Sequence, residues 1–303
     1  MANPISRPPA SSGQGEALAT WGLWGVLLAM IAVTYTRLDS EVLYHVTGNG
    51  LSGAMSRVVV EMNYPLSLVS IPLILIALDA LPRGWWWVGG PALVLCAVTA
   101  WPGVVDDADL DVRLINAVPA LGVMTALVLS LVAARRTSAR FAPRSRYDPV
   151  RVALVLAVLV LSLPWIAADL GFYLPDSVFI MERPVTGSDG VTTTAVHLGH
   201  HHGFDGALIL ISALVLSRAR LRSASLALAT KLFVSLMLAY GAVNFAQDFW
   251  HEQIVKRHWS EWQIPGATKP SLTLIWLVIL AATAGAALLL SFEERSRSDP
   301  ASG

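Results

Sequence analysis

Residues 197–218 read HLGHHHGFDGALILISALVLSR, a histidine run that leads directly into an apolar segment. The run holds four of the seven histidines in the chain, and no charged residue follows Asp205 until Arg218. An uninterrupted apolar stretch of this kind is typical of a helix that is buried in a core or a membrane. The pattern therefore predicts a helix whose first end carries metal-binding or proton-transferring side chains.

Similar apolar segments recur along the whole chain. Of its 303 residues, 55% are hydrophobic and only 14% are charged, and the mean hydropathy is +0.59. Runs of about 17 to 25 apolar residues are long enough to cross a bilayer as helices. The sequence therefore predicts an all-α, polytopic membrane bundle of about eight transmembrane helices, at residues 17–37, 58–81, 84–104, 113–134, 150–174, 204–218, 224–248 and 271–292.

The segments outside this bundle are short. Residues 1–16 are rich in Pro, Ser and Gly and predict a disordered cytoplasmic tail, residues 17–292 form the membrane domain, and residues 293–303 form a second cytoplasmic tail. The first apolar segment lacks a clear cleavage signal and is interpreted as a retained helix. The single cysteine, Cys96, excludes a disulfide framework, and the net charge of zero gives no support for a nucleic-acid partner.

The distribution of basic residues predicts the orientation in the cell membrane. Lys and Arg in short loops are retained on the cytoplasmic side, and the loop from Arg135 to Arg151 holds six arginines. With that loop inside, 13 basic residues are cytoplasmic and 7 are outside, and both termini are cytoplasmic. All seven histidines then lie outside, so the extracytoplasmic face is expected to carry the function.

The histidine run has the spacing of a metal site if the helix begins a turn or two before its apolar part. His197, His201 and Asp205 would then lie on one face, at i, i+4 and i+8, with His200 beside them. Neutral imidazole is a common ligand for transition metals. The alternative is a solvated histidine-rich loop that binds metal only adventitiously.

A second polar element lies at the outer end of the following segment. Asn244, Asp248 and Glu252 share a helical face, and Asp248 and His251 have the i, i+3 spacing found in di-metal helical bundles. The alternative is an interfacial helix end whose polar groups simply meet water. Because the two elements lie on successive helices with their polar ends on the same side, a shared site is favoured.

Acidic residues elsewhere on the outer side are candidates to complete this site. Arg57 and Glu61, at i and i+4, begin the second segment, although the same spacing suits a local ion pair. Asp169 lies near the outer end of the fifth segment, and an acid within a membrane segment is a functional candidate by default.

The sequence thus predicts a metal-dependent enzyme, either a hydrolase or an oxidase, whose site lies at the extracytoplasmic face and acts on a lipid or lipid-linked substrate. The expected ligands are nitrogen and carboxylate donors without a thiolate, which favours zinc or iron. Glu252 is the expected general base toward a metal-bound water. The expected ligands are His197, His200, His201 and His251, with Asp205 or Asp248 as a carboxylate ligand or as a support to the histidines.

Two families offer partial resemblances. The His-x-x-His-His spacing of residues 197–201 resembles one box of the membrane fatty-acid desaturases and hydroxylases, whose several boxes face the cytoplasm, whereas this run is predicted to face outward. The outer site is similar in outline to the zinc hydrolases of the ceramidase and adiponectin-receptor type, whose closing His-x-x-x-His is matched by His197 and His201. Helix count and motif order differ, so neither resemblance is interpreted as membership.

Two other functions fit the composition. A divalent-metal or proton transporter or sensor would need polar residues along the inner halves of the helices, which are almost entirely Ala, Val, Leu and Ile. A structural subunit of a larger membrane complex would use the histidines for haem or not at all, and histidines are absent from the middle of the predicted segments. The enzyme hypothesis is therefore preferred.

Overall fold

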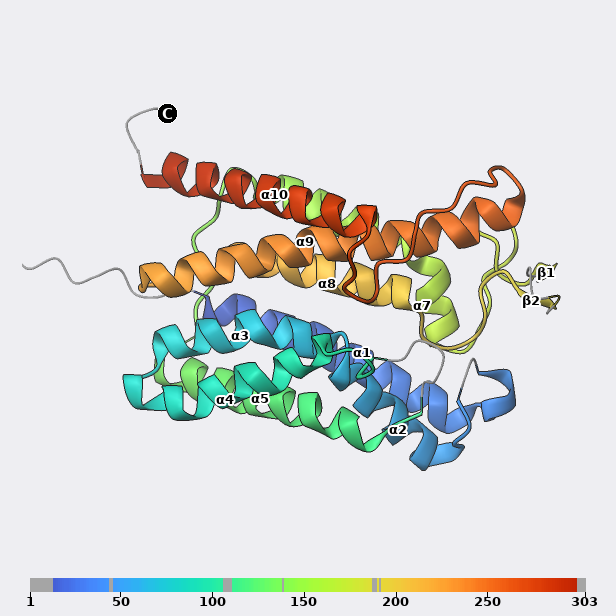
Figure 1. Ribbon diagram of the computed structural model, residues 1–303, viewed down its shortest axis with the longest axis horizontal. Helices are drawn as coiled ribbons and strands as arrows, with labels where there is room; N and C mark the ends of the chain where they lie inside the picture. The colour runs from blue at the N-terminus through green and yellow to red at the C-terminus, as the bar shows by residue number, and fades with distance from the viewer. Residues whose placement is uncertain are drawn as a thin grey trace, which may run out of the picture.

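The computed structural model describes residues 13–43, 46–105, 111–137, 139–186, 190 and 192–298. In these residues the chain is an all-α bundle with one short β-hairpin, which confirms the predicted fold class (Figure 1). The hairpin pairs β1 (Pro184–Thr186) with β2 (Thr192–Thr194) in antiparallel register, Val185 opposite Thr193.

The helices follow the predicted apolar segments in order. They are α1 (Gln14–Arg37), α2 (Gly50–Asn63), α3 (Leu66–Ala80), α4 (Trp86–Ala97), α5 (Ala117–Thr137), α6 (Asp148–Leu161), α7 (Leu163–Asp169), α8 (His202–Leu216), α9 (Ala224–Gln253) and α10 (Leu274–Ser298). Single 3-10 turns lie at η1 (Ser40–Val42), η2 (Arg83–Trp85), η3 (Val98–Ala100), η4 (Leu114–Asn116) and η5 (Val255–Arg257).

Most of these helices lie along the long axis of the molecule (Figure 1). In this view α10 and α9 form one side, α3, α4 and α5 form the other, and α1 and α8 lie between them. Helix α8 packs against α9 and α1, and α3 also contacts α9. The beginning of α1 and the end of α10 lie at the same end of the bundle, whereas α8 begins and α9 ends at the opposite end, beside the hairpin.

Helix α8 is the buried centre of the bundle because it is apolar on nearly every face. Leu208 and Ile209 pack in one continuous core with Ile31 of α1 and Leu73 of α3. A polar pair also crosses this core, where Trp24 Nε1 donates to Ser212 Oγ at 3.0 Å. The core fixes α8, and with it the position of the histidine run that precedes it.

Two prolines lie at bends between consecutive helices, close to the start of α8. Pro65 separates α2 from α3, which meet at 54°, and Pro164 lies at the start of α7, which makes 57° with α6. Proline lacks the N–H that would continue the preceding helix, and its ring disfavours helical geometry in the residue before it. The bends place the end of α2, with Glu61, and the end of α7, with Asp169, beside the loop that leads into α8.

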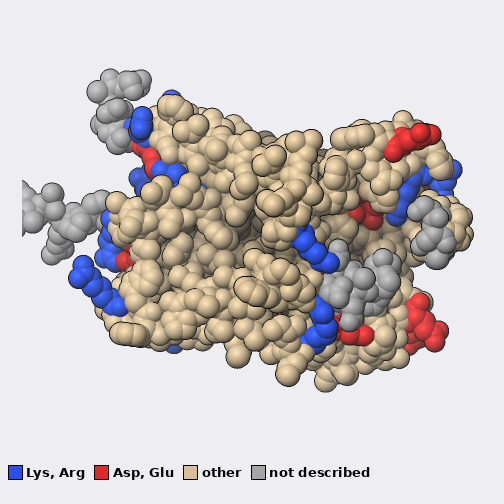
Figure 2. Space-filling view, viewed as in Figure 1, with Lys and Arg blue, Asp and Glu red and all other residues tan. Residues whose placement is uncertain are grey.

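Several helices are long and apolar enough to cross a membrane. Four segments have the required length and apolar composition individually: α1, α5 with η4, α9 with η5, and α10. The number of candidate spans rises to six if each of the two bent helix pairs forms one span. The predicted number of eight spans and the side on which the termini lie stay predictions. Figure 2 shows most Lys, Arg, Asp and Glu side chains toward the two ends of the molecule, with a broad uncharged region between them.

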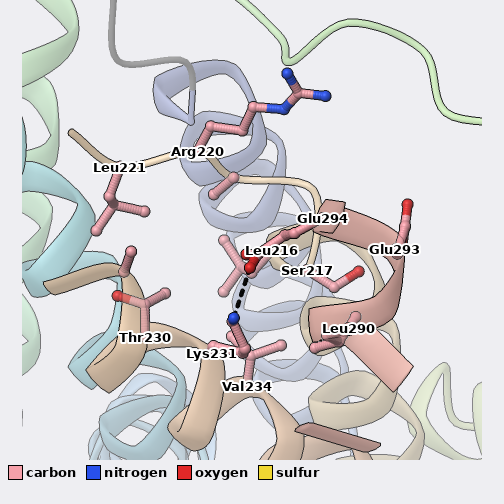
Figure 3. A pocket seen from close by; sticks show the side chains of 12 residues that line it. Leu216, Ser217, Arg220, Leu221, Thr230, Lys231, Val234, Leu290, Glu293 and Glu294 are labelled. Carbon is pink, nitrogen blue, oxygen red and sulfur yellow. Dashed lines mark hydrogen bonds and ion pairs between the residues drawn. The ribbon is translucent and has the colours of Figure 1, made fainter. Parts of the chain in front are cut away.

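The end of the bundle opposite the histidine run is joined by ion pairs. Arg151 of α6 pairs with Glu293 of α10 at 2.5 Å, and Lys231 of α9 pairs with Glu294 at 2.5 Å (Figure 3). The Lys231 pair lies in a cavity of about 360 Å³ between α8, α9 and α10. Lys231, which lies within the predicted segment 224–248, is therefore matched by an acid from the neighbouring helix.

The predicted tails fall largely beyond the described residues. Helix α1 begins at Gln14, three residues before the predicted segment, and residues 1–12 lie outside the described part. Helix α10 extends to Ser298, and residues 299–303 also lie outside it.

Candidate metal centre

The first three histidines of the run lie in the loop before α8, and only His202 belongs to the helix. Helix α8 begins at His202, and His201 has extended backbone angles of φ −119° and ψ 142°. The expectation that His197, His201 and Asp205 share one helical face is therefore wrong. The cause is Gly199, whose φ of +101° belongs to a turn that few other residues adopt. A Cβ atom at Gly199 would also lie 2.7 Å from Tyr35 Oη.

The turn directs His200 into a buried group with two acids from separate helices. His200 Nε2 lies 2.6 Å from Asp205 Oδ1 of α8 and 3.4 Å from Glu61 Oε2 of α2. One ligand atom from each of the three residues lies within 4.8 Å of the others, and all three residues are buried. This first group, Glu61, His200 and Asp205, can hold a metal ion.

A third acid orients the His200 ring. His200 Nδ1 lies 3.2 Å from Asp169 Oδ1 at the end of α7, and the backbone N–H of His200 donates to Tyr35 Oη at 3.1 Å. In metal sites, a histidine that binds the ion through one ring nitrogen commonly donates from the other to a carboxylate or carbonyl. Asp169 and His200 have this arrangement, with Nε2 directed at Asp205 and Glu61.

The charges of the first group call for a cation. Arg57 pairs with Glu61 at 2.7 Å, so one guanidinium faces the three carboxylates of Glu61, Asp169 and Asp205. With His200 neutral, as a metal ligand must be, two negative charges would be left in a buried region, where unpaired charge is costly. Burial lowers the pKa of His200, but the three carboxylates outweigh it and raise that pKa well above its ordinary value. The site therefore attracts protons or a divalent cation.

Unpaired oxygens support the metal interpretation of this group. Among the described residues, neither Glu61 Oε2 nor Asp169 Oδ2 has a hydrogen-bond partner, although His200 Nε2 lies 3.4 Å from Glu61 Oε2, and both oxygens are buried. Buried polar atoms are otherwise satisfied in nearly all cases, and each exception calls for an explanation such as a bound ion or water. The residues of the first group thus fit a metal ion in donor type, burial and charge.

A second group lies on the α9 side of the same loop. His201 Nδ1 is 3.2 Å from Glu252 Oε1 and 4.0 Å from Asp248 Oδ2, and the three residues are buried. His201 Nε2 lies 3.0 Å from the carbonyl oxygen of His197, to which it can donate. Burial lowers the pKa of His201, but Glu252 and Asp248 outweigh it and raise that pKa above its ordinary value. The second group, His201, Asp248 and Glu252, can also hold a metal ion.

Both acids of the second group receive further hydrogen bonds. Trp165 Nε1 of α7 donates to Glu252 Oε2 at 2.6 Å, and the backbone N–H of Gly203 donates to Asp248 Oδ2 at 2.9 Å. Gly203 belongs to the first turn of α8, where free N–H groups favour an anion. The carboxylates are thereby held in place even without an ion.

The two groups contain five of the predicted site residues. The first group holds His200 and Asp205, and the second holds His201, Asp248 and the predicted general base, Glu252. The other two predicted ligands, His197 and His251, belong to neither group. The His197 ring stacks on that of His201 with 3.9 Å between centroids, and burial, followed by the charge of His201, lowers the pKa of His197 well below its ordinary value. His251 is partly exposed, and His45 lies outside the described residues.

Glu61 and Asp169 were weaker candidates in the sequence. The i, i+4 spacing of Arg57 and Glu61 correctly suggested an ion pair, and it did not show that Glu61 also meets His200. Trp165 and Tyr35 carried no signal, because a tryptophan or tyrosine in an apolar segment is usually a packing or interfacial residue.

No known protein family, curated protein or solved structure matches the chain. What the chain can do follows from the chemistry of the two groups themselves.

Proposed function

We propose that the protein is a membrane metalloenzyme that acts on a lipid or lipid-linked substrate at the extracytoplasmic face. The observation that carries the proposal is the first group, in which three buried residues from two helices and a loop converge, with His200 oriented by Asp169. The predicted outward orientation of the histidines and the apolar helices around them support a substrate drawn from the bilayer.

Glu61, His200 and Asp205 would bind the metal. One nitrogen and several carboxylate oxygens, without a thiolate, favour zinc or iron over copper(I). Such an ion would supply Lewis-acid chemistry toward water, an ester or a phosphoryl group. Arg57 holds Glu61 in place through an ion pair, and Asp169 holds His200 in place through its Nδ1 atom.

Glu252 and His201 would handle protons. The 3.2 Å between Glu252 Oε1 and His201 Nδ1 allows the pair to share one proton, and Trp165 holds the other carboxylate oxygen. A general base of this kind suits both hydrolysis and oxidation, so it does not distinguish the two reactions. The identity of the bound metal would distinguish them.

The middle of the bundle favours an enzyme over a transporter. A path for ions or protons would need polar groups between the two ends of the molecule. Among the described residues, the helices around α8 are joined there by a continuous hydrophobic core that includes Leu27, Leu73, Leu208 and Ile209.

Metal content tests the proposal. Wild-type protein, purified in detergent and washed with a mild chelator, is expected to retain about one equivalent of zinc or iron, because each of three ligands contributes to a buried site. His200→Ala and Asp205→Asn are expected to lose it, as measured by inductively coupled plasma mass spectrometry.

The control is His251→Ala, which removes a partly exposed histidine outside both groups and is expected to retain the metal. His201→Ala reports on the second group separately. Metal-free wild-type protein would show that the first group is a hydrogen-bonded network and not a metal centre. Equal metal content in wild type and His200→Ala would likewise contradict a metal centre at this group.

A further inference from the structure

A cavity of about 540 Å³ lies between α3, α9, the segment from Ala97 to Val105, and the loop and first turn of α10. Its walls are mainly apolar, with Leu68 and Ile71 on α3 and Phe233, Leu236 and Met237 on α9. Its size lies within the range of small-molecule binding sites, and an apolar cavity does not hold ordered water well. An apolar ligand is therefore the occupant that its lining favours.

The cavity is built from helices that can span a membrane. Helix α9 with η5 and helix α10 are each long and apolar enough to span a membrane. Helix α3 belongs to a bent pair, α2 with α3, that is long and apolar enough when the two helices are taken as one span. Trp101 and Trp276 also line the cavity. Tryptophan is enriched where the bilayer interface begins, so the cavity is expected to lie at the depth of lipid chains just below that interface.

Two tyrosines form a polar part of the wall. Tyr240 Oη donates to the carbonyl oxygen of Thr268 at 2.9 Å, so the hydrogen bond between the two hydroxyls must come from Tyr64. Tyr64 follows the end of α2, three residues after Glu61. The polar part of the wall therefore adjoins the end of the helix that carries Glu61.

We propose that this cavity binds one acyl chain of a bilayer phospholipid, with the oxygen-rich ester region at the Tyr64–Tyr240 pair. The chain would lie against Leu68, Ile71 and Leu236, and the ester would lie at the two tyrosine hydroxyls, beside the end of the helix that carries Glu61. The role of this lipid as substrate rests on the proposed function, whereas binding of the chain requires only the cavity.

Photo-crosslinking tests the binding. The full-length protein would be placed in nanodiscs with a phosphatidylcholine that carries a diazirine at the end of one acyl chain, and the labelled peptides would be mapped by mass spectrometry. Labelling is expected to concentrate on the cavity side of α3 and α9. Leu236→Trp is expected to lower it by about fivefold or more, because an indole fills the space that the chain needs.

Leu232→Trp is the matched control, since it makes the same change one turn earlier on α9, at an exposed position outside the cavity lining. It is expected to leave labelling unchanged. If Leu236→Trp protein is not monodisperse, Ile71→Trp narrows the cavity from the α3 wall. Labelling spread evenly over the lipid-facing helices, or unaffected by either cavity variant, would overturn the inference.

The same labelling on chelator-washed protein and on His200→Ala separates the two proposals. Both samples are expected to keep the cavity labelling, because neither change alters the cavity wall. Cavity labelling without retained metal would remove the enzyme proposal alone. Retained metal with evenly spread labelling would remove the lipid inference alone.

Discussion

Arg57 and His200 are the basic side chains that lie among three buried carboxylates. Arg57 meets Glu61 directly, while His200 lies between Asp205 and Asp169 and, among the described histidines, alone contacts acids through both ring nitrogens. A buried ion pair contributes little net stability when both partners are present, but removal of one partner leaves an uncompensated charge. The first group should therefore respond sharply to single substitutions and weakly to paired ones.

Arg57→Met is expected to destabilise the protein by about 3 to 5 kcal/mol, the usual effect of leaving one member of a buried pair alone. The double variant Arg57→Met/Glu61→Gln should recover much of this loss, because it removes both charges. Thermal unfolding in detergent, followed by circular dichroism, measures the difference. Arg183→Met, at an exposed arginine, should change stability by no more than about 0.5 kcal/mol; a similar loss in both single variants would contradict the prediction.

Residue spacing correctly placed Asp248 and Glu252 on one face of α9. Asp248 and Glu252 share a helical face, and both reach His201. His251 does not join them, although the i, i+3 spacing suggested that it would. Side chains that are i, i+4 apart lie more nearly in line along a helix than those i, i+3 apart, so a group facing α8 selects Asp248 and Glu252 and leaves His251 to one side.

The first turn of helix α8 packs closely against α7 and α9. At Gly203 an added Cβ would lie 2.4 Å from Asp248 Oδ2 and 2.6 Å from a ring atom of Trp165. Glycine is therefore the residue that lets the first turn of α8 approach both groups. This contact cannot be recognised from the sequence, where Gly203 reads as an ordinary residue of a histidine-rich loop.

Gly203→Ala is expected to destabilise the protein by about 1 to 3 kcal/mol, because the extra methyl group overpacks a filled space. Gly22→Ala is the matched substitution, since Gly22 lies within α1 with no atom near its missing Cβ. That change should be neutral or stabilising by up to about 1 kcal/mol, as alanine favours helix. Melting temperatures of the two variants should thus move in opposite directions or differ clearly, and equal shifts would show that Gly203 has room.

The two ends of the whole molecule differ in chemistry. One end joins α6, α9 and α10 through Arg151–Glu293 and Lys231–Glu294, whereas the other holds the two histidine and carboxylate groups. The apolar core separates them. An asymmetric bundle of this kind has a defined orientation in a membrane, which the basic residues of the sequence predict.

Cysteine labelling tests that orientation. The one native cysteine, Cys96, is buried and should not react, so single cysteines can be introduced without further changes. Glu261→Cys, in the loop after α9, should react with a membrane-impermeant maleimide on intact cells. Arg144→Cys, in the loop between α5 and α6, should react only after permeabilisation. The reverse pattern would place the histidine end in the cytoplasm.

The sequence by itself determined the all-α bundle and the approximate course of its helices. Apolar runs of this length must satisfy their backbone hydrogen bonds internally, and helices do so with local contacts alone. It also placed the histidine run and the end of α9 at one end of the molecule, since consecutive antiparallel helices bring those ends together. It predicted one shared site there, whereas the structure has two groups.

The tertiary structure alone decided which side chains meet. Glu61 and Asp169 reach His200 because α2 ends and α7 begins at a proline bend beside α8, and His200 turns toward them because Gly199 has a positive φ. The separation of His200 and His201 into different groups has the same origin, as successive side chains of an extended segment point to opposite sides. These features depend on contacts between residues distant in the chain, which local patterns of hydropathy do not contain.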